Sequence, residues 1–325
     1  MKAAVIERQG GVENIVYRDF EDPIVRPGDL LIRVKACGLN HFDIFARRGM
    51  PGQAVPMPFI SGGDIAGEVA EVGPGVSGWK VGDRCLVDPD TDEGIVGEQI
   101  LGGMAELARV KAGFVIPLDD RLSYEQAACI PANFGTTYRM LFTNGDLQPN
   151  DLVLVLGASG GVGTATVAVA KAHGARVIAC AGTDDKCEKL KELGANYVVN
   201  YSELDFSREA WRISGKKGVD VCVNFTGGDT WVPSIRAMAH RGQLITVGAT
   251  AGFDPNTDIR YIWQRELRII GSNGYTIEDV RRGMIEAAEG RIKLPPMRTF
   301  PLKELGKAEA AMEARDFFGK IVLAV

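Results

Sequence analysis

A glycine-rich turn between an apolar run and a helix-like segment is the feature that most limits the fold of this chain. Residues 152–156 (LVLVL) are continuously apolar, and the following turn, 157–163, reads GASGGVG. From Ala158 it reads A-x-G-x-x-G, with alanine in place of the first glycine of a dinucleotide fingerprint. A strand, a glycine turn and a helix in this order expose free N–H groups and a positive dipole end to a pyrophosphate. An ordinary strand-to-helix turn is the alternative, but the combination favours a dinucleotide site at Ser159, Gly160, Gly161 and Val162, with Gly163 packed close to the strand.

Strand-like and helix-like segments alternate from this turn onward. The strand-like segments are apolar along most of their length, and segments with helical spacing separate them. This pattern is typical of a parallel sheet that is buried on both faces. We expect strands at 152–156, 176–181, 197–200, 219–224, 243–247 and 267–270, and helices at 123–142, 162–173, 186–193 and 205–214. The fold class is therefore α/β, with a doubly wound parallel sheet.

The residues before and after this sheet indicate a second domain. Residues 1–122 contain short apolar runs interrupted by Pro-Gly and Gly-x-Gly turns, which is typical of many short antiparallel strands without a long helix. A chain of 325 residues also exceeds what one core usually supports. We expect the terminal strand, 319–323, to return to the sheet of the first domain. The predicted domains are a β-rich domain at 1–122, an α/β domain at 123–274, and a return to the first domain at 275–325.

Charge and hydropathy exclude several classes of partner and location. The net charge of −5 argues against a broad nucleic-acid or anionic-membrane surface. No run of about 18 uncharged apolar residues is present, and the N-terminus lacks the apolar region of a signal peptide. The six cysteines form no C-x-x-C pair, so we expect reduced and mostly buried thiols. These features predict a cytoplasmic protein with neither a nucleic-acid nor a membrane partner.

The end of the second strand of the α/β domain bears on the choice of dinucleotide. An NAD site normally has an acidic residue there for the ribose 2′-hydroxyl, about 20 residues after the glycine turn. Here the strand ends in Gly182-Thr183, and Asp184 and Asp185 are better placed to begin the next helix. Lys186 could meet a 2′-phosphate, with Gly182 and Thr183 as donors, or it could be a solvated helix residue. The missing acid favours NADPH over NADH.

Five further strings carry a resemblance to a known family. They are GLNHFD at 38–43, PFISGGDIAG at 58–67, WKVGDR at 79–84, GGMAE at 102–106 and FFGKIV at 317–322. In this order and at this spacing the chain resembles the medium-chain dehydrogenase/reductase superfamily, and within it the zinc-free quinone oxidoreductase (zeta-crystallin-like) branch. The resemblance covers nearly the whole chain. It implies a GroES-like β-rich catalytic domain joined to a Rossmann domain.

The resemblance also bears on zinc. Zinc-dependent alcohol dehydrogenases of this superfamily place a Cys, a His in a G-H-E string, an acid and a second Cys around a catalytic metal. Here the first Cys position is Asn40, the G-H-E string reads Gly63-Asp64-Ile65, and the later Cys position falls near Ala132-Asn133. His41 and Asp64 remain, but a catalytic zinc needs three protein ligands. The segment that would hold a structural zinc, 90–101, contains no cysteine. We therefore expect no metal.

The front-domain string also supplies the expected catalytic residues. Asn40 matches the position that lies against the nicotinamide ribose and the substrate in the quinone reductase branch, where an amide can donate and accept hydrogen bonds. Asp43 matches a recurrent acid of the same loop, although it is as readily explained as a loop-stabilising residue. His41 could relay a proton and Cys37 could be reactive, but a satisfied histidine and a buried thiol are the better interpretations. Arg47 could meet an acidic substrate or be solvated.

Further residues complete the expected site. Thr226 follows the strand 219–224, where the carboxyl ends of strands meet the ligand. By resemblance, Tyr201 packs near the 2′-phosphate, and backbone groups after the next two strands hold the carboxamide. The latter are at Val247, Gly248, Ala249, Ser272 and Asn273. An apolar pocket wall is expected from Phe42, Phe45, Phe134 and Trp263, although aromatic residues are more often core than pocket.

The expected activity follows from these features. Without a Lewis acid, reduction of a conjugated acceptor is less demanding than oxidation of an alcohol. We expect NADPH to deliver hydride to a quinone or an α,β-unsaturated carbonyl compound, with the oxygen anion held by hydrogen bonds. An enoyl-CoA or acryloyl-CoA type reductase, a carbonyl reductase derived from a zinc-free alcohol dehydrogenase, and an NADPH-binding crystallin-like or sensory protein are the alternatives. By analogy, the edge strand near 267–270 would support a homodimer or homotetramer.

Overall fold

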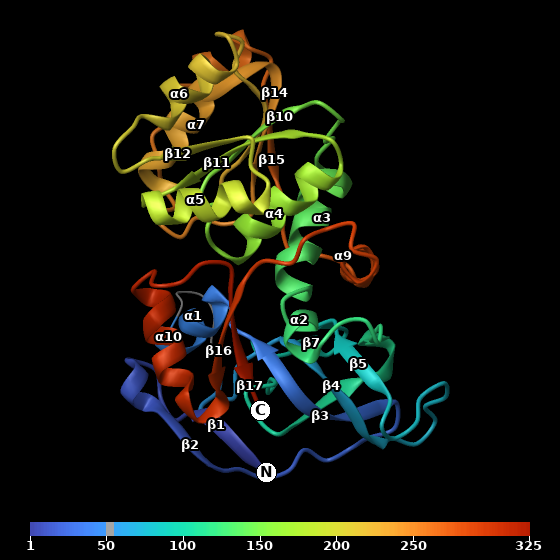
Figure 1. Cartoon of the computed structure of the whole chain (residues 1–325). Coiled ribbons are helices and arrows are strands. Elements are labelled where there is room, and N and C mark those ends of the chain that lie inside the picture. Colours follow the sequence, from blue (N-terminus) through green and yellow to red (C-terminus); the bar gives the residue numbers. More distant parts are fainter. Residues whose placement is uncertain (50–54) are drawn as a thin grey trace. The chain divides into compact units, whose positions relative to one another are not determined.

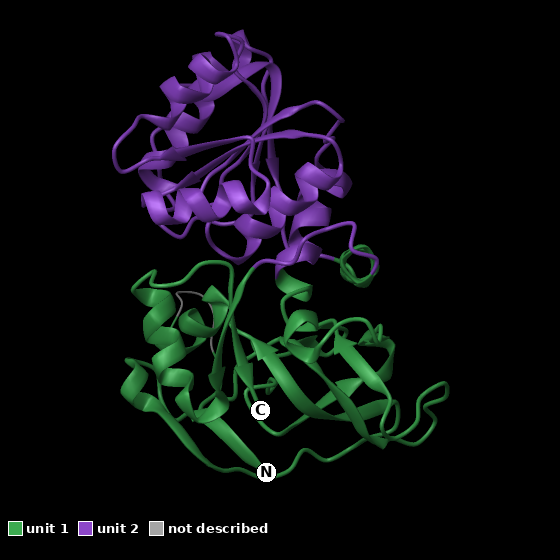
Figure 2. Ribbon diagram, in the orientation of Figure 1, with its two compact units in different colours: residues 1–132, 276–288, 296–325 green, residues 133–275, 289–295 purple. Residues whose placement is uncertain are grey.

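The computed structural model describes residues 1–49 and 55–325, and these form two compact units (Figure 2). Unit 1 comprises residues 1–132, 276–288 and 296–325, and unit 2 comprises residues 133–275 and 289–295. The sequence placed the first boundary after residue 122, ten residues earlier. The difference arises because α2 (Tyr124–Ala127) packs against the strands β3 (Asp29–Gly38) and β4 (Asp64–Val72) of unit 1.

Unit 1 is built on a sheet of seven strands. Its order is β16-β17-β3-β4-β5-β9, with β8 also paired with β3. The terminal strand β17 pairs antiparallel with β3, so the end of the chain lies beside residues 36–38. The strands of unit 1 are β1 (Lys2–Ile6), β2 (Ile15–Asp19), β3 (Asp29–Gly38), β4 (Asp64–Val72), β5 (Arg84–Val87), β6 (Asp90–Thr91), β7 (Gly94–Ile95), β8 (Leu107–Lys111), β9 (Val115–Pro117), β16 (Met297–Pro301) and β17 (Lys320–Ala324).

The helices of unit 1 include one that the sequence pattern missed. This helix, α1 (His41–Arg48), has only eight residues, too few to give a clear helical period. The others are α2, α9 (Ile277–Ala288), α10 (Leu305–Glu313) and the 3-10 turns Val12–Asn14, Ala112–Phe114 and Leu302–Glu304. The core of the unit lies between the sheet and α10, where buried residues of β3, β4 and β17 pack with Leu305, Ala308 and Met312.

Unit 2 contains a six-stranded parallel sheet, as the alternation of apolar strands and helices predicts. Its order is β12-β11-β10-β13-β14-β15, and every neighbouring pair is parallel. The chain runs outward from β10 to β12 and then restarts on the other side at β13, so the strand order reverses between β10 and β13. The strands are β10 (Leu152–Val155), β11 (Arg176–Ala181), β12 (Tyr197–Asn200), β13 (Val219–Val223), β14 (Met238–Thr246) and β15 (Arg268–Gly271).

Helices cover both faces of this sheet (Figure 1). On one face lie α4 (Gly161–Ala172) and α5 (Asp184–Leu193), and on the other lie α6 (Phe206–Ile213) and α7 (Trp231–Ala237). The predicted helix at 123–142 is divided into α2, two π-helical segments (Pro131–Gly135 and Arg139–Asn144) and the short α3 (Thr136–Tyr138), and α8 (Arg260–Gln264) completes the unit. None of the described helices is long and apolar enough to cross a membrane.

Candidate active site

The expected cofactor-binding residues lie along one edge of the sheet of unit 2. Each of them follows the carboxyl end of a strand, and carboxyl ends of parallel strands meet at the same edge. They are Ser159–Val162 after β10, Gly182–Lys186 after β11, Tyr201 after β12, Thr226 after β13, Val247–Ala249 after β14, and Ser272 and Asn273 after β15. The reversal of strand order between β10 and β13 falls at the middle of this edge, which is the usual ligand position in such sheets.

The turn after β10 has the geometry that the glycine pattern predicts. A Cβ atom on Gly163 would lie 2.4 Å from the Gly157 carbonyl oxygen and 2.7 Å from the Cα of Ala158, so α4 can approach the turn only with glycine here. Gly160 is extended and caps α4, whose first N–H groups follow it. The N-terminus of a twelve-residue helix therefore lies directly after the strand, as an anion-binding turn requires.

A buried amide beside this helix terminus fits an anionic group. The Nδ2 atom of Asn133 is buried and has no hydrogen-bond partner among the described residues. The carboxamide lies against Gly161, because a Cβ atom there would be 2.5 Å from Asn133 Oδ1. An amide nitrogen that is buried without an acceptor is costly, and an acceptor oxygen on a bound phosphate or ribose would satisfy it. No binding role was predicted for Asn133 from the sequence.

The turn after β11 brings together four of the expected residues. Thr183 caps α5, and its Oγ1 accepts a 3.4 Å hydrogen bond from the Lys186 backbone N–H. The hydroxyl of Tyr201 lies 3.2 Å from the position of a Cβ atom on Gly182, so the ring covers that glycine. Asp184 accepts a 2.9 Å hydrogen bond from Asn200 Nδ2, which assigns this acid to the start of α5. No acidic side chain lies at the strand tip itself.

Asn224, at the end of β13, shapes the turn that carries Thr226. Its Oδ1 accepts hydrogen bonds from the N–H groups of Thr226 (2.9 Å) and Gly227 (3.0 Å). Its Nδ2 donates to the hydroxyls of Thr230 and Ser234, so all its hydrogen-bonding capacity serves the turn. The sequence singled out the turn but assigned no role to Asn224. A polar residue at the end of an apolar strand was the signal available.

The residues expected to hold the carboxamide differ in exposure. Val247 and Ala249 are half-buried, whereas Gly248 and Asn273 are exposed. Ser272 is buried, and its Oγ accepts a 2.9 Å hydrogen bond from Asn144 Nδ2. Its hydroxyl oxygen is therefore bonded to the π-helical segment before β10, and its backbone N–H donates to the Thr246 carbonyl oxygen at 2.9 Å, so the hydroxyl hydrogen is the donor that Ser272 can offer to a ligand.

The expected pocket wall is only partly supported. Phe134 is 0% exposed, so it presents no surface to a small molecule, and this expectation was wrong. Trp263 lies on α8 and is 64% exposed, so its ring faces solvent and does not form an enclosed wall. Phe42 packs against the small apolar cluster of Ile6, Ala46 and Phe59, and Phe45 is half-buried beside His41.

In unit 1 the residues expected at the metal positions surround a lysine. Lys320, the first residue of β17, donates from Nζ to Asn40 Oδ1 (2.7 Å) and to Asp64 Oδ2 (2.8 Å). Asn40 Nδ2 also donates to Asp64 Oδ2, at 3.0 Å. The Lys320 and Asp64 side chains are 2% and 1% exposed, while Asn40 is half-buried. From the sequence, Lys320 was noted only as part of the family string at 317–322, and its contact with Asn40 and Asp64 was not predicted.

Asp43 stabilises the loop that presents Asn40. Its two carboxylate oxygens accept hydrogen bonds from the backbone N–H groups of Asn40 (2.7 Å) and Gly62 (2.8 Å). Burial raises the pKa of Asp43 to about 7, although the Asn40 hydrogen bond opposes this shift. These contacts make Asp43 a positioning residue, because neither oxygen is free to meet a substrate.

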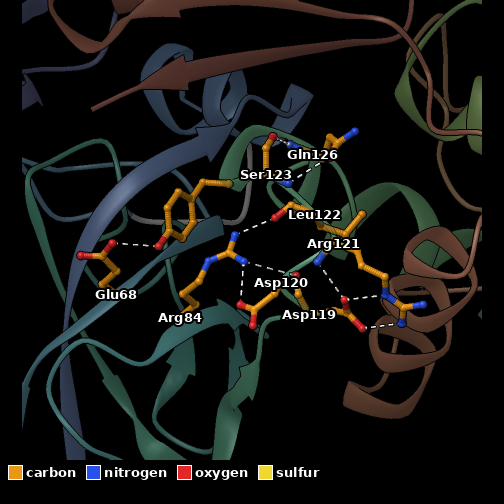
Figure 3. Close-up of polar contacts among 9 residues, drawn as sticks. Glu68, Arg84, Asp119, Asp120, Arg121, Leu122, Ser123 and Gln126 are labelled. Atoms are coloured by element: carbon orange, nitrogen blue, oxygen red, sulfur yellow. Dashed lines mark hydrogen bonds and ion pairs between the residues drawn. The ribbon is translucent and has the colours of Figure 1, made fainter.

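A polar network fixes the segment that precedes Ala132 (Figure 3). Arg84 on β5 donates to the Leu122 carbonyl oxygen at 2.6 Å, and its guanidinium lies 4.7 Å from the centre of the Tyr124 ring. Tyr124 donates in turn to Glu68 on β4 at 2.8 Å. The network anchors the start of α2 to the sheet, and the chain then delivers the Ala132 N–H to Asp64 Oδ1 at 3.0 Å.

Two other residues of this region have structural roles. Cys37 is 0% exposed, and burial raises the pKa of its thiol, so it is not a reactive thiolate. Arg47 is 1% exposed and pairs with Glu309 and Glu313 of α10, so it is neither solvated nor available to a substrate. Among the described residues, no group of three or more His, Cys, Asp or Glu side chains is arranged to hold a metal ion.

Comparison with known proteins identifies the family. The alcohol dehydrogenase GroES-like domain matches residues 26–120, and the zinc-binding dehydrogenase domain matches residues 161–290. A 2-haloacrylate reductase of Burkholderia sp is 31% identical, and the alignment covers 99% of this chain and 98% of that protein. The chain belongs to the medium-chain dehydrogenase/reductase superfamily. The prediction of a GroES-like domain and a Rossmann sheet is thereby confirmed.

Other members of the superfamily are similar over their full length. A quinone oxidoreductase of Rattus norvegicus is 29% identical over 99% of this chain and 97% of its own. The crystal structure of an NAD-dependent alcohol dehydrogenase matches with a TM-score of 0.95 and 33% identity, and all of both chains is covered. These relatives identify this superfamily member as an oxidoreductase with a nicotinamide dinucleotide cofactor.

Proposed function

We propose that this protein is a zinc-independent, NADPH-dependent reductase of quinones or α,β-unsaturated carbonyl compounds. The observation that carries the proposal is the buried ammonium of Lys320, which is bonded to Asn40 and Asp64. By the resemblance, two of the metal-ligand positions of zinc-dependent relatives fall on or beside these residues. A lysine ammonium repels a metal cation and does not ligate it. An acceptor that is already polarised by conjugation suits such a site better than an alcohol does.

The residues of unit 2 would hold the cofactor in the manner of a Rossmann domain. The first N–H groups of α4 and the Asn133 amide would bind the pyrophosphate region, and the edge formed by Thr226, Val247–Ala249 and Asn273 would hold the nicotinamide end. When bound, the nicotinamide supplies the hydride. Within unit 1, the Asn40 amide would donate a hydrogen bond to the substrate oxygen and stabilise the negative charge that forms there.

The preference for NADPH rests on the turn after β11. A ribose 2′-hydroxyl is normally bound by an acid at the tip of this strand, whereas Asp184 lies at the start of α5 and accepts a hydrogen bond from Asn200. Thr183, Lys186 and Tyr201 are grouped at the same turn, where a hydroxyl, a cation and a phenol suit a 2′-phosphate. We therefore propose NADPH, although the alcohol dehydrogenase named above is NAD-dependent.

The deciding experiment is an NADPH oxidation assay with a panel of quinones, enones, acryloyl-CoA and simple aldehydes, with and without a metal chelator. Turnover of quinones or enones that survives chelation supports the proposal. Loss of turnover on chelation, with recovery on added zinc, overturns the zinc-independent mechanism. Preferred turnover of the CoA thioester or of simple carbonyls would select the alternative reductases. Tight NADPH binding without turnover of any acceptor would favour a structural or sensory role.

The oligomeric state belongs to the same proposal. The strand β15 is the last strand of the six-stranded sheet, and its Ile269 is 39% exposed. An unpaired sheet edge with an exposed apolar residue is suited to pairing with a second copy across a two-fold axis. We propose a homodimer or homotetramer, which light scattering would distinguish from a monomer. The cytoplasmic location stays a prediction.

A further inference from the structure

We infer that Lys320 is a positioning residue that fixes the Asn40 amide so that one of its N–H groups is directed to the substrate oxygen. The inference rests on the proposed reductase function. It adds a reason for the type of substrate, because an amide held in this way presents a donor to a carbonyl or quinone oxygen. Lys320 acts through Asn40 and does not itself touch the reacting atoms.

The hydrogen bonds around Asn40 distinguish the two ends of its amide. Oδ1 accepts from the ammonium of Lys320 at 2.7 Å, and Nδ2 donates to the Asp64 carboxylate at 3.0 Å. If the amide were flipped, Nδ2 would face the ammonium and Oδ1 would face the carboxylate, and both contacts would be repulsive. Lys320 and Asp64 therefore allow only one orientation of the amide.

This orientation leaves one hydrogen of Nδ2 available. A primary amide nitrogen has two hydrogens, and Asp64 accepts one of them. The described residues of unit 1 provide no second acceptor for Nδ2, and Asn40 is half-buried, whereas Lys320 and Asp64 are buried. Asn40 is thus the member of the cluster with accessible surface, and we infer that its second Nδ2 hydrogen is the group that meets the substrate. A substrate with an acceptor oxygen, such as a carbonyl compound or a quinone, satisfies this donor.

The chain is built closely around this cluster. A Cβ atom on Gly38 would lie 2.3 Å from the Ala128 carbonyl oxygen and 2.8 Å from Lys320 Cε, so only glycine leaves room for the lysine. Asp64 Oδ2 accepts from both Lys320 and Asn40, and Oδ1 accepts from the Ala132 N–H at 3.0 Å. Because every member of the cluster is held on more than one side, the amide is preorganised before a substrate arrives.

The cluster occupies the positions that the resemblance assigned to metal binding. Asn40 stands at the first Cys position, Asp64 lies within the segment of the G-H-E string, and Ala132 lies near the later Cys position. In the structure Asn40 and Asp64 both bond the ammonium of Lys320, and the Ala132 N–H bonds the other carboxylate oxygen of Asp64. We infer that the lysine supplies the fixed positive charge of this region, and that it acts by orienting a donor instead of binding the substrate oxygen directly.

The test is a double-mutant cycle between Lys320→Met and Asn40→Ala, read as kcat/KM for a quinone or enone. Removal of one preorganised donor usually costs about 10²–10³ in rate, so we expect each single variant to lose about 10²-fold. If Lys320 acts through Asn40, the double variant is no slower than Asn40→Ala alone, within about threefold. The matched control is Lys35→Met, which removes a half-buried Lys35–Glu68 pair of the same sheet and should change kcat/KM by less than about twofold.

Two further measurements separate positioning from loss of structure. Lys320→Met combined with Asp64→Asn removes both charges, so it avoids an uncompensated buried carboxylate, and it should fold yet remain slow. The Asn40 side-chain amide resonances, assigned by their loss in Asn40→Ala, should shift in Lys320→Met and not in Lys35→Met. NADPH affinity, measured by fluorescence titration, should stay within about twofold in Lys320→Met, in its combination with Asp64→Asn, and in Lys35→Met.

The outcomes are distinguishable. Wild-type activity in Lys320→Met, unchanged Asn40 amide resonances, or losses that multiply in the double variant would each overturn the inference while leaving the reductase function intact. If the wild-type protein binds NADPH but reduces no acceptor, the proposed function itself fails, and the substrate role of Asn40 fails with it.

Discussion

Arg47 on α1 and Glu309 on α10 form an ion pair in which both side chains are almost completely buried, with exposures of 1% and 0%. Arg47 also bonds Glu313 and the Gly10 carbonyl oxygen, so one guanidinium joins three segments of unit 1. Residues 41–48 follow directly after Asn40, so this pair also fixes the helix that begins at the candidate active site. The neighbouring Arg48 pairs with Glu313 as well, but it is 58% exposed.

Arg47→Met should destabilise the protein strongly. The substitution leaves Glu309 buried without its counter-charge, and breaking a buried pair in this way usually costs about 3–5 kcal/mol. Arg48→Met is the control, because an exposed pair contributes about 0–1 kcal/mol. Urea unfolding followed by circular dichroism measures both. Equal unfolding midpoints for the two variants would contradict the structural role of the buried pair.

Asp43 should make stability depend on pH in an identifiable direction. Burial raises its pKa from the ordinary 3.8 to about 7, so between about pH 4 and pH 7 the folded protein keeps a proton that the unfolded chain has released. The free energy of unfolding therefore decreases as pH rises through this window, and the loss is complete above about pH 7. Asp43→Asn removes this titration, so its unfolding free energy should fall less between pH 4.5 and 7.5 than that of the wild type.

Two other acids of unit 1 have raised pKa values, so the pH dependence of Asp43→Asn must be compared with that of the wild type. Burial also raises the pKa of Asp88 to about 6 and that of Glu98 to about 7, and both shifts have the same sign. Asp88 and Glu98 still titrate in Asp43→Asn. The contribution of Asp43 is therefore the difference between this variant and the wild type in how the unfolding free energy depends on pH. Asp92→Asn serves as the control, because Asp92 is an exposed acid of the same unit. Parallel pH profiles for Asp43→Asn and the wild type would refute the assignment.

Lys186→Ala should reduce the preference for NADPH. A charge-assisted bond to a phosphate contributes about 1.5–3 kcal/mol, so we expect roughly tenfold or greater weakening of NADPH binding and little change for NADH. The matched control is Lys191→Ala on the same helix, since Lys191 pairs with Glu188 on the surface. Fluorescence titration with both nucleotides measures the effect. Unchanged discrimination in Lys186→Ala would remove this residue from the cofactor argument.

The sequence predicted the α/β sheet well because its signals are local. The apolar runs, the glycine turn and the helix after it lie within about 25 residues, and Gly163 makes the close approach that the pattern requires. The expected cofactor residues lie at one edge for the same reason, since each follows a parallel strand. Phe134 was assigned wrongly because an apolar ring carries no sequence signal that separates a pocket wall from a core.

The cluster around Lys320 could not be predicted from local sequence patterns. Lys320 and Asn40 are separated by 280 residues, and they meet only because β17 pairs antiparallel with β3. One signal was present: a lysine opens a terminal strand that is otherwise apolar, and a charge in such a position must find a partner. The choice of partner depended on strand order, which the sequence did not supply.

Asn133→Ala should weaken the binding of NADPH and of NADH equally, in contrast to Lys186→Ala. Asn133 Nδ2 is buried without a partner among the described residues and lies beside the N-terminus of α4, where the pyrophosphate common to NADPH and NADH would bind. One hydrogen bond to a charged group contributes about 1.5–3 kcal/mol, so affinity for each nucleotide should fall about tenfold or more. Asn133→Asp should lower the affinity for both nucleotides further, because a carboxylate would repel the phosphates.

Thr143→Ala, at an exposed position of the following π-helical segment, is the control. Isothermal titration calorimetry with both nucleotides measures the effect, and a loss confined to one of them would place Asn133 away from the pyrophosphate.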